Sequence, residues 1–305
     1  MNEHAFWIIA IASLVGVSCS LVGVFLVLRR LAMVGDAISH AVLFGIASAF
    51  LLAGSRSPFV MLIGATAVGL LTVFITNVLN SWGKLQEDAS IGVTFTWLFA
   101  LGVILISAFA GQVDLDQECV LYGEIAFAPF DVLTIGGVEW GPRSFWMLAL
   151  VLLVNLTFVA LFYQKLKTVT FDPILARCLG INVTLWHYLL MTLVSLTVVA
   201  AFESVGAILV VAMLVVPANA AILSCRSIAR ILVVATGISL AASVGGYYLA
   251  AATDTAIAAA IALVAGGFFL FVLCFVGERS VLTVCRNRLR RGQAVSPISL
   301  GASSD

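Results

Sequence analysis

Long apolar segments alternate with short polar connections along almost the whole chain. A helix needs about 20 mostly apolar residues to cross the hydrocarbon core of a bilayer. Nine segments meet or approach this length, and they are 5–28, 34–54, 58–80, 91–110, 144–164, 186–202, 205–223, 231–252 and 255–276. Only Glu203 and Ser204 separate the sixth segment from the seventh. The pattern predicts an all-α polytopic membrane protein with about nine transmembrane helices.

The composition of the chain supports a membrane environment. Of its 305 residues, 63% are hydrophobic and 10% are charged, whereas soluble domains carry about 25% charged residues. A soluble fold of this size cannot bury so much apolar surface, so the bilayer is the solvent that suits it. The first apolar segment has no basic region before it and is long enough to span the membrane. We therefore expect a resident helix there and not a cleaved signal.

The distribution of basic residues predicts the orientation, because cytoplasmic loops of membrane proteins are enriched in Lys and Arg. If the 28–34 connection is cytoplasmic, 13 of the 15 Lys and Arg residues fall inside, and Arg56 and Arg143 fall outside. The inside residues are Arg29, Arg30, Lys84, Lys165, Lys167, Arg177, Arg226, Arg230, Arg279, Arg286, Arg288, Arg290 and Arg291. We expect an external N-terminus and a cytoplasmic C-terminus in a bacterial inner membrane.

Two connections and the C-terminal tail are longer than simple turns. The external connection 111–143 is acidic, and its apolar part from Val120 to Phe130 is expected to lie on the membrane or dip into it. The internal connection 165–185 is expected to be structured. The transmembrane domain is assigned to residues 1–285, and the basic, Ser-rich tail 286–305 is expected to be a disordered cytoplasmic segment.

The sequence Gly35-Asp36-Ala37-Ile38-Ser39-His40 places an acid and an imidazole in the second apolar segment. Residues four apart lie on one face of a helix, so Asp36 and His40 can act together. A mixed oxygen and nitrogen ligand set suits Mn, Fe or Zn better than Cu(I) or Ca. Ionisable residues inside a membrane are costly and are by default functional candidates. The alternative is a local pair that braces the helix near the headgroups.

A second motif lies in the internal connection, where residues 171–181 read FDPILARCLGI. Asp172 can cap a helix whose first turn contains Pro173, and Gly180 can end it. A short capped helix between two spans suggests a docking element for a cytosolic partner. An ordinary interfacial helix is the alternative, and the residues alone favour it.

Other polar residues give weaker indications. Glu203 lies at the outer edge of the seventh apolar segment, where a solvated loop residue is expected more than a ligand in a transport pathway. The spans offer too few ionisable groups for a catalytic cluster, which argues against a membrane enzyme. A GxxxxGK[ST] phosphate-binding loop does not occur in the sequence, so the chain is not expected to hydrolyse ATP by that route.

Four stretches together resemble the permease subunits of manganese, zinc and iron ATP-binding-cassette importers, and they occur in the order found in that family. They are LRRLAMVGDAISHAVLFGIA (28–47), KLQEDASIGV (84–93), FDPILARCLGI (171–181) and VGAILVVAMLVVPANAAIL (205–223). The similarity extends over residues 30–280. One departure is Phe44, where many members of the family carry proline.

The resemblance implies a function that the spacing alone does not give. The chain would be a transport subunit for a divalent metal, without a permanently bound cofactor, and a separate cytosolic subunit would hydrolyse ATP. Asp36 and His40 match the positions of proposed metal ligands in the translocation path. A coupling segment at 172–181 would dock the ATPase, and the residues matched there are Asp172, Pro173, Ala176 and Gly180.

The resemblance also implies a second permease copy or a related permease, and an extracytoplasmic protein that delivers the metal. Two alternatives remain open. An iron-chelate or cobalamin importer permease has a similar helical architecture but needs a wide pathway. A secondary transporter driven by an ion gradient has no use for an ATPase dock.

Overall fold

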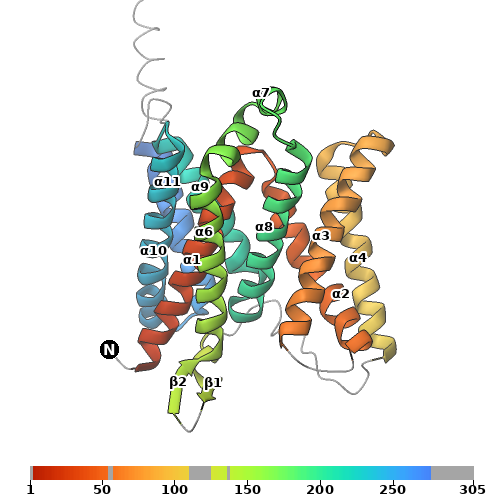
Figure 1. The fold of residues 1–305 in the computed structure, drawn as a ribbon. Coiled ribbons are helices and arrows are strands. Elements are labelled where there is room, and N and C mark those ends of the chain that lie inside the picture. Colours follow the sequence, from red (N-terminus) through yellow and green to blue (C-terminus); the bar gives the residue numbers. More distant parts are fainter. Residues whose placement is uncertain (1–2, 54–57, 110–124, 136–137, 276–305) are drawn as a thin grey trace, which may run out of the picture.

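The computed structural model describes residues 3–53, 58–109, 125–135 and 138–275 (Figure 1). Within these ranges, nine helices are long and apolar enough to cross a membrane. They are α1 (Glu3–Leu28), α2 (Ala32–Ala53), α3 (Pro58–Gly83), α4 (Glu87–Phe109), α6 (Arg143–Phe171), α8 (Val183–Val205), α9 (Ala207–Ser224), α10 (Ile228–Thr253) and α11 (Ile257–Phe275). The expected all-α polytopic architecture is confirmed.

The nine helices run up and down in one bundle, and the short helix α7 (Pro173–Cys178) stands at one end of it (Figure 1). Helix α1 contacts α6, α8, α9 and α10, while α2, α3 and α4 pack against one another. Contacts of α2 and α3 with α8 join these two parts. Glu3 and Phe275 lie at opposite ends of the bundle, as nine crossings require.

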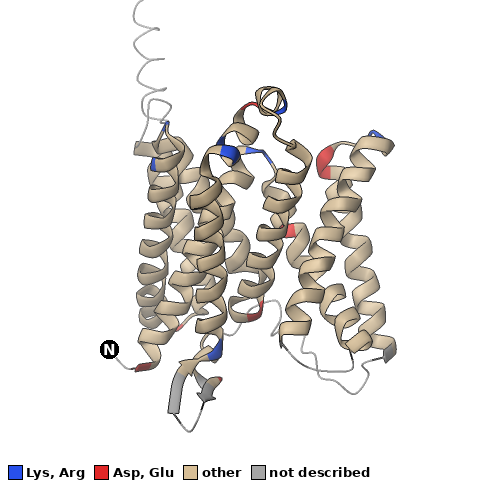
Figure 2. Cartoon of the chain, viewed as in Figure 1, with Lys and Arg blue, Asp and Glu red and all other residues tan. Residues whose placement is uncertain are grey.

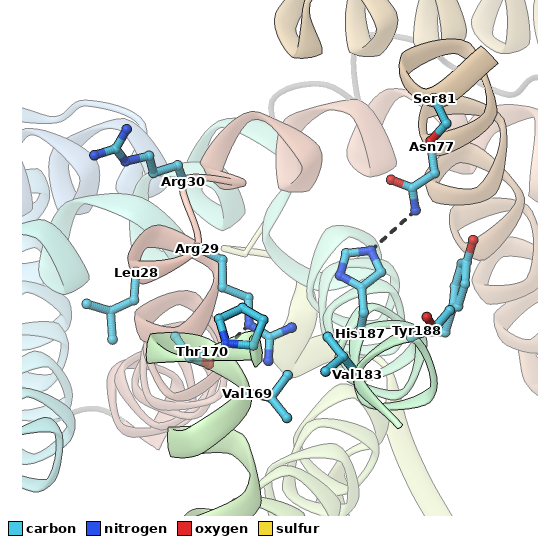
Figure 3. A pocket seen from close by; sticks show the side chains of 12 residues that line it. Leu28, Arg29, Arg30, Asn77, Ser81, Val169, Thr170, Val183, His187 and Tyr188 are labelled. Carbon is cyan, nitrogen blue, oxygen red and sulfur yellow. Dashed lines mark hydrogen bonds between the residues drawn. The ribbon is translucent and has the colours of Figure 1, made fainter. Parts of the chain in front are cut away.

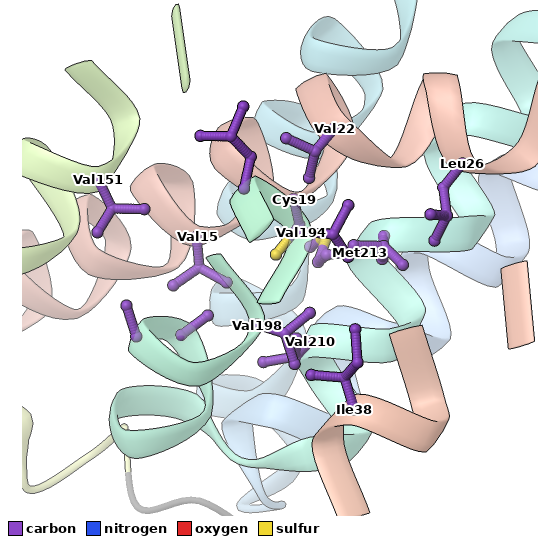
Figure 4. Close-up of a cluster of buried hydrophobic side chains, with 14 of the residues drawn as sticks. Val15, Cys19, Val22, Leu26, Ile38, Val151, Val194, Val198, Val210 and Met213 are labelled. Atoms are coloured by element: carbon purple, nitrogen blue, oxygen red, sulfur yellow. The ribbon is translucent and has the colours of Figure 1, made fainter. Parts of the chain in front are cut away.

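The centre of the bundle is an apolar cluster between α1, α8 and α9. Its fully buried side chains include Val15, Cys19, Val194, Val210 and Met213 (Figure 4). The cluster also reaches Ile38 on α2, so the helix that carries Asp36 and His40 is fixed on one face by the same core. Because this packing fixes the rotation of α2 about its axis, the face that carries Asp36 and His40 points away from the core.

The helix boundaries differ from the sequence-based expectation at two places in particular. Helix α6 continues to Phe171, beyond the expected end at residue 164, with non-helical backbone angles at Phe162 inside it. Helices α8 and α9 are separated by Gly206 and not by Glu203 and Ser204. Gly206 has φ 79° and ψ 167°, a backbone conformation that is open to glycine and costly for residues with a Cβ atom.

The connection at 111–143 contains structure, among its described residues, that the hydrophobic pattern does not reveal. A short 3₁₀ helix, η1 (Ala128–Phe130), precedes an antiparallel hairpin of β1 (Val132–Ile135) and β2 (Val138–Pro142). The hairpin lies at the end opposite α7 (Figure 1). Residue Ile125, from the apolar stretch that precedes it, is buried. Residues 111–124 of this connection and the tail 286–305 lie outside the described residues.

The charged side chains are distributed unevenly between the two ends of the bundle. Lys and Arg gather at the end that carries α7, among the described residues (Figure 2). The basic connections 29–31, 84–86 and 225–227 all lie at this end, because each joins two helices whose neighbouring termini are there. The clustering of Lys and Arg at one end of the bundle agrees with the distribution of basic residues along the sequence from which the orientation was predicted.

Candidate functional site

The ionisable pair of the GDAISH motif lies on one face of helix α2, near the end of the bundle that carries α7. Asp36 and His40 are four and eight residues from the start of α2 at Ala32, which places them roughly 6 and 12 Å along the helix axis. His40 Nε2 and Asp36 Oδ1 are 3.7 Å apart. The expected placement of both groups on one helix face is confirmed.

The separation of these two atoms is suitable for a shared metal ion. At 3.7 Å they are too far apart for a hydrogen bond. Two ligand atoms that each lie about 2.1 Å from one ion are roughly 3 to 4 Å from each other. An ion can therefore bind between the carboxylate and the imidazole with little movement of either side chain.

Two aromatic rings of helix α4 hold the imidazole of His40. The ring of Phe95 is stacked on it, with centroids 5.4 Å apart and planes inclined by 27°. The ring of Phe99 meets it edge-on at 6.1 Å. Such contacts favour one rotamer of His40, in which the Nε2 atom points toward Asp36. No sequence motif marks Phe95 or Phe99, because apolar residues fill α4 throughout.

The distance between α2 and α4 is set by a close backbone contact one turn beyond His40. A Cβ atom added to Gly102 of α4 would lie 2.8 Å from the backbone nitrogen of Phe44 and 3.0 Å from its Cα atom. Only glycine allows this approach without displacing a helix. Phe44, the residue at which the sequence departs from the resembling family, therefore lies at the crossing of α2 and α4.

The pair is open on the side away from the core. The side chains of His40 and Asp36 are 32% and 35% exposed, whereas their neighbours Ala37, Ile38 and Ser39 are buried. Among the described residues, no group of three or more His, Cys, Asp or Glu side chains is arranged to hold a metal ion. Asp36 and His40 thus form a pair of candidate ligands in a partly exposed position.

The segment 172–181 forms the capped helix that the sequence predicts. The Asp172 carboxylate oxygen Oδ1 accepts hydrogen bonds from the backbone N–H groups of Ile174 and Leu175, at 3.1 and 2.9 Å. At the other end, the Gly180 N–H donates to the Arg177 carbonyl and the Ile181 N–H to the Ala176 carbonyl. Gly180 has φ +75°, so this end is a Schellman motif that needs glycine.

Helix α7 has one buried and one exposed face. Ala176 is fully buried and belongs to the main apolar cluster, so it anchors the helix to the bundle. The side chains of Ile174, Leu175 and Leu179 are 75%, 48% and 63% exposed. Exposed aliphatic side chains on a short helix outside the membrane-spanning segments form a surface that a protein partner can cover.

Glu203 is not brought together with Asp36 and His40. It lies in the last turn of α8, exposed, at the end of the bundle opposite α7. Asp36 is close to the α7 end. Glu203 is helical, which corrects the expectation that it lies in a loop. Helix α8 ends at Val205, and its C-cap is Gly206, three residues after Glu203.

Comparisons with known proteins agree with this architecture. The family model of the ABC 3 transport family matches residues 1–276. The chain is 48% identical to the manganese transport system membrane protein MntD of Bacillus subtilis (strain 168) over 277 residues, which cover 91% of this chain and 94% of that protein. It is 42% identical to the zinc transport system membrane protein TroD of Treponema pallidum (strain Nichols) over 279 residues, covering 91% and 76%.

A solved structure has the same fold. The match is to PsaBC from Streptococcus pneumoniae in complex with Fab, with a TM-score of 0.78 and 31% identity, over 93% of this chain and 96% of that chain. The described helices, the family match and these relatives agree over nearly the whole length. The chain is a member of the ABC 3 transport family, a family of membrane transport proteins.

Proposed function

We propose that this chain is the membrane-spanning permease of an ATP-driven importer, and that it moves a divalent transition-metal ion (Mn, Zn or Fe) into the cytoplasm. The chain itself is a transport subunit, and a separate subunit hydrolyses ATP. Membership of the ABC 3 transport family supports the transport function. The metal is the substrate and not a resident cofactor.

The observation that carries the choice of substrate is the Asp36–His40 pair. Its oxygen and nitrogen atoms lie 3.7 Å apart on a spanning helix that carries no other ionisable residue. This ligand chemistry suits borderline divalent ions, and relatives named for manganese and zinc transport are 48% and 42% identical to the chain. A site with few protein ligands binds weakly, which allows the ion to be released on the other side.

A second permease copy, or a related permease, completes the pathway in this proposal. A carboxylate that is 35% exposed on a spanning helix would face lipid in an isolated protomer, and such a placement is costly. Apposition of two copies along α2 and α4 would remove the pair from lipid. It would also raise the number of available ligands from two to four, as many as a tetrahedral divalent ion binds.

Helix α7 is the proposed dock for the ATPase subunit. Asp172 and Pro173 start the helix, Ala176 anchors it and Gly180 ends it. The helix presents its apolar face at the end of the bundle where Lys and Arg gather, which is the cytoplasmic end if the positive-inside rule applies. The N-terminus is then external, and an extracytoplasmic binding protein delivers the metal from that side.

A reconstitution experiment tests the function as a whole. The chain is produced with its ATPase subunit and partner permease in inverted and right-side-out vesicles, and labelled Mn, Zn and Fe are supplied in turn. We expect ATP-dependent accumulation of at least one metal in the orientation that corresponds to import. Equal accumulation with and without ATP, driven by an ion gradient, would instead identify a secondary transporter.

A further inference from the structure

A second polar site lies at the α7 end of the bundle, apart from Asp36 and His40. It is a cavity of about 650 Å³ between the α1–α2 connection and the ends of α3, α6 and α8. Two arginines, Arg29 and Arg30, line it together with His187, Asn77 and several hydroxyl-bearing side chains. No Asp or Glu is among its lining residues. Its size is in the range of small-molecule sites.

Arg29 is the central charged group of this cavity. Its Nε atom donates a 3.1 Å hydrogen bond to Thr170 Oγ1, while its Nη2 atom is buried and has no hydrogen-bond partner. Figure 3 shows the side chain extending toward Thr170, with His187 nearby. Burial lowers the pKa of Arg29 to about 10, so the guanidinium is still charged at neutral pH.

No ion pair between Arg29 and an acidic side chain is found among the described residues. Asp172, next to the lining residue Pro173, uses Oδ1 to cap α7. Glu87 lines a separate small cavity, and the two cavities share the hydrogen-bonded residues Asn77 and His187. Across the described parts of the chain, the ion pair that is present joins His40 to Asp36 and not Arg29 to an acid. A partly buried guanidinium whose Nη2 atom is buried without a partner, and which lies beside other donors, favours binding of an anion.

We propose that this cavity binds a phosphate-bearing anion. The guanidinium fork and the surrounding hydroxyl, amide and imidazole groups match the several acceptor oxygens of a phosphate. The cavity lies where spanning helices end, so the phosphate can come from a lipid headgroup or from the cytoplasm. Thr170 and Pro173 connect the site directly to the start of α7. An occupant therefore contacts the segment that positions α7.

Binding is measured on the full-length chain purified with its ATPase subunit in neutral, phosphate-free detergent. Thermal unfolding is followed during titration with inorganic phosphate and, separately, with dioctanoyl-phosphatidylglycerol. Sodium chloride at equal ionic strength and dioctanoylglycerol are the controls that lack phosphate. We expect a saturable increase in Tm with one or both probes. An increase with phosphatidylglycerol alone identifies a lipid source, and an increase with inorganic phosphate identifies a soluble one.

Arg29→Gln should raise the Kd of the active probe by about tenfold or more, because a charge-assisted hydrogen bond is lost. Arg230→Gln is the matched control, since Arg230 is exposed at the same end of the bundle and does not line the cavity; its Kd should equal that of the wild type. If Arg29→Gln does not fold, Arg29→Lys keeps the charge, loses the fork and should give a smaller loss.

Two results would overturn the proposal. One is a wild-type protein whose Tm responds to neither probe beyond the salt and diacylglycerol controls, which would leave a carboxylate of a protein partner as the counter-charge of Arg29. The other is an unchanged Kd in both Arg29 variants. Because the assay measures binding and not metal uptake, its outcome is independent of the proposed transport function.

Discussion

The imidazole of His40 lies against the ring of Phe95, with centroids 5.4 Å apart and planes inclined by 27°. The contact joins the helix that carries the proposed metal ligands to helix α4. It keeps His40 within 3.7 Å of Asp36 without a hydrogen bond between them. The pair is thus positioned by packing, and its lone pairs remain available to an ion.

Phe95→Leu should therefore reduce metal uptake while leaving the ligands in place. Loss of an aromatic contact worth about 0.5–1.5 kcal/mol lets His40 populate other rotamers, so we expect a two- to tenfold slower uptake. Initial uptake rates at equal protein levels are the measurement. Phe271→Leu, an exposed phenylalanine on α11, is the control. Uptake equal to that of the control would mean that the stack does not position His40.

Gly102→Val should separate α2 from α4. The new side chain would meet the backbone of Phe44, which cannot move aside without shifting the helix, and overpacking of this kind costs about 1–3 kcal/mol. We expect a lower Tm in detergent and slower uptake. Gly92→Val is the matched control on the same helix, because a Cβ atom there meets nothing within 4 Å. The same Tm for both variants would argue against a close α2–α4 contact.

Gly180→Val should weaken the docking of the ATPase subunit and thereby uncouple ATP hydrolysis from transport. A β-branched residue at φ +75° is strained by about 1–2 kcal/mol, which opens the Schellman motif and loosens α7. We expect the protein to insert normally but to retain its ATPase subunit poorly during copurification. Gly237→Val, in helical backbone with open space around it, should behave as wild type. Normal ATPase retention and transport by Gly180→Val would show that α7 is not the dock.

The orientation can be tested without any transport assay. Reporter fusions after Ile125 and after Asp305 should report opposite compartments, the first outside and the second in the cytoplasm, because the basic connections belong inside. A phosphatase active only outside and a fluorescent protein active only inside are suitable reporters. Signals from the same compartment would contradict the proposed topology.

Much of the fold could be predicted from the sequence because each spanning helix needs a long apolar run. The capped helix at 172–181 was also readable, since Asp172, Pro173 and Gly180 each act on their own backbone neighbourhood. The break at Gly206 was missed because apolar residues continue on both sides of it. The hairpin at 132–142 was missed because its short strands lack a clear alternation of apolar and polar residues.

Only part of the candidate site could be predicted from the sequence, for a related reason. Asp36 and His40 are four residues apart, so helix geometry alone brings them together. Phe95 lies on α4, and the Phe44–Gly102 contact joins α2 to that helix. Asn77 and His187 are 110 residues apart. Contacts of this kind depend on tertiary packing, and no local pattern in one sequence encodes them.

We propose that Asp36 and His40 bind the metal as it crosses the membrane. Asp36→Asn keeps the size and removes the charge, and His40→Ala removes the nitrogen ligand. Ser48→Ala is the control on the same helix, because the Ser48 hydroxyl donates a hydrogen bond to the backbone carbonyl of Gly45 in its own helix. All three variants should reach the membrane and retain the ATPase subunit as the wild type does.

The most direct test is the initial rate of labelled Mn, Zn and Fe uptake into vesicles that carry the whole importer with these variants. We expect Asp36→Asn and His40→Ala each to lower uptake at least tenfold, because losing one of so few ligands removes most of the binding. Ser48→Ala should transport normally. Wild-type rates in both Asp36→Asn and His40→Ala would contradict the account and identify the pair as a structural brace.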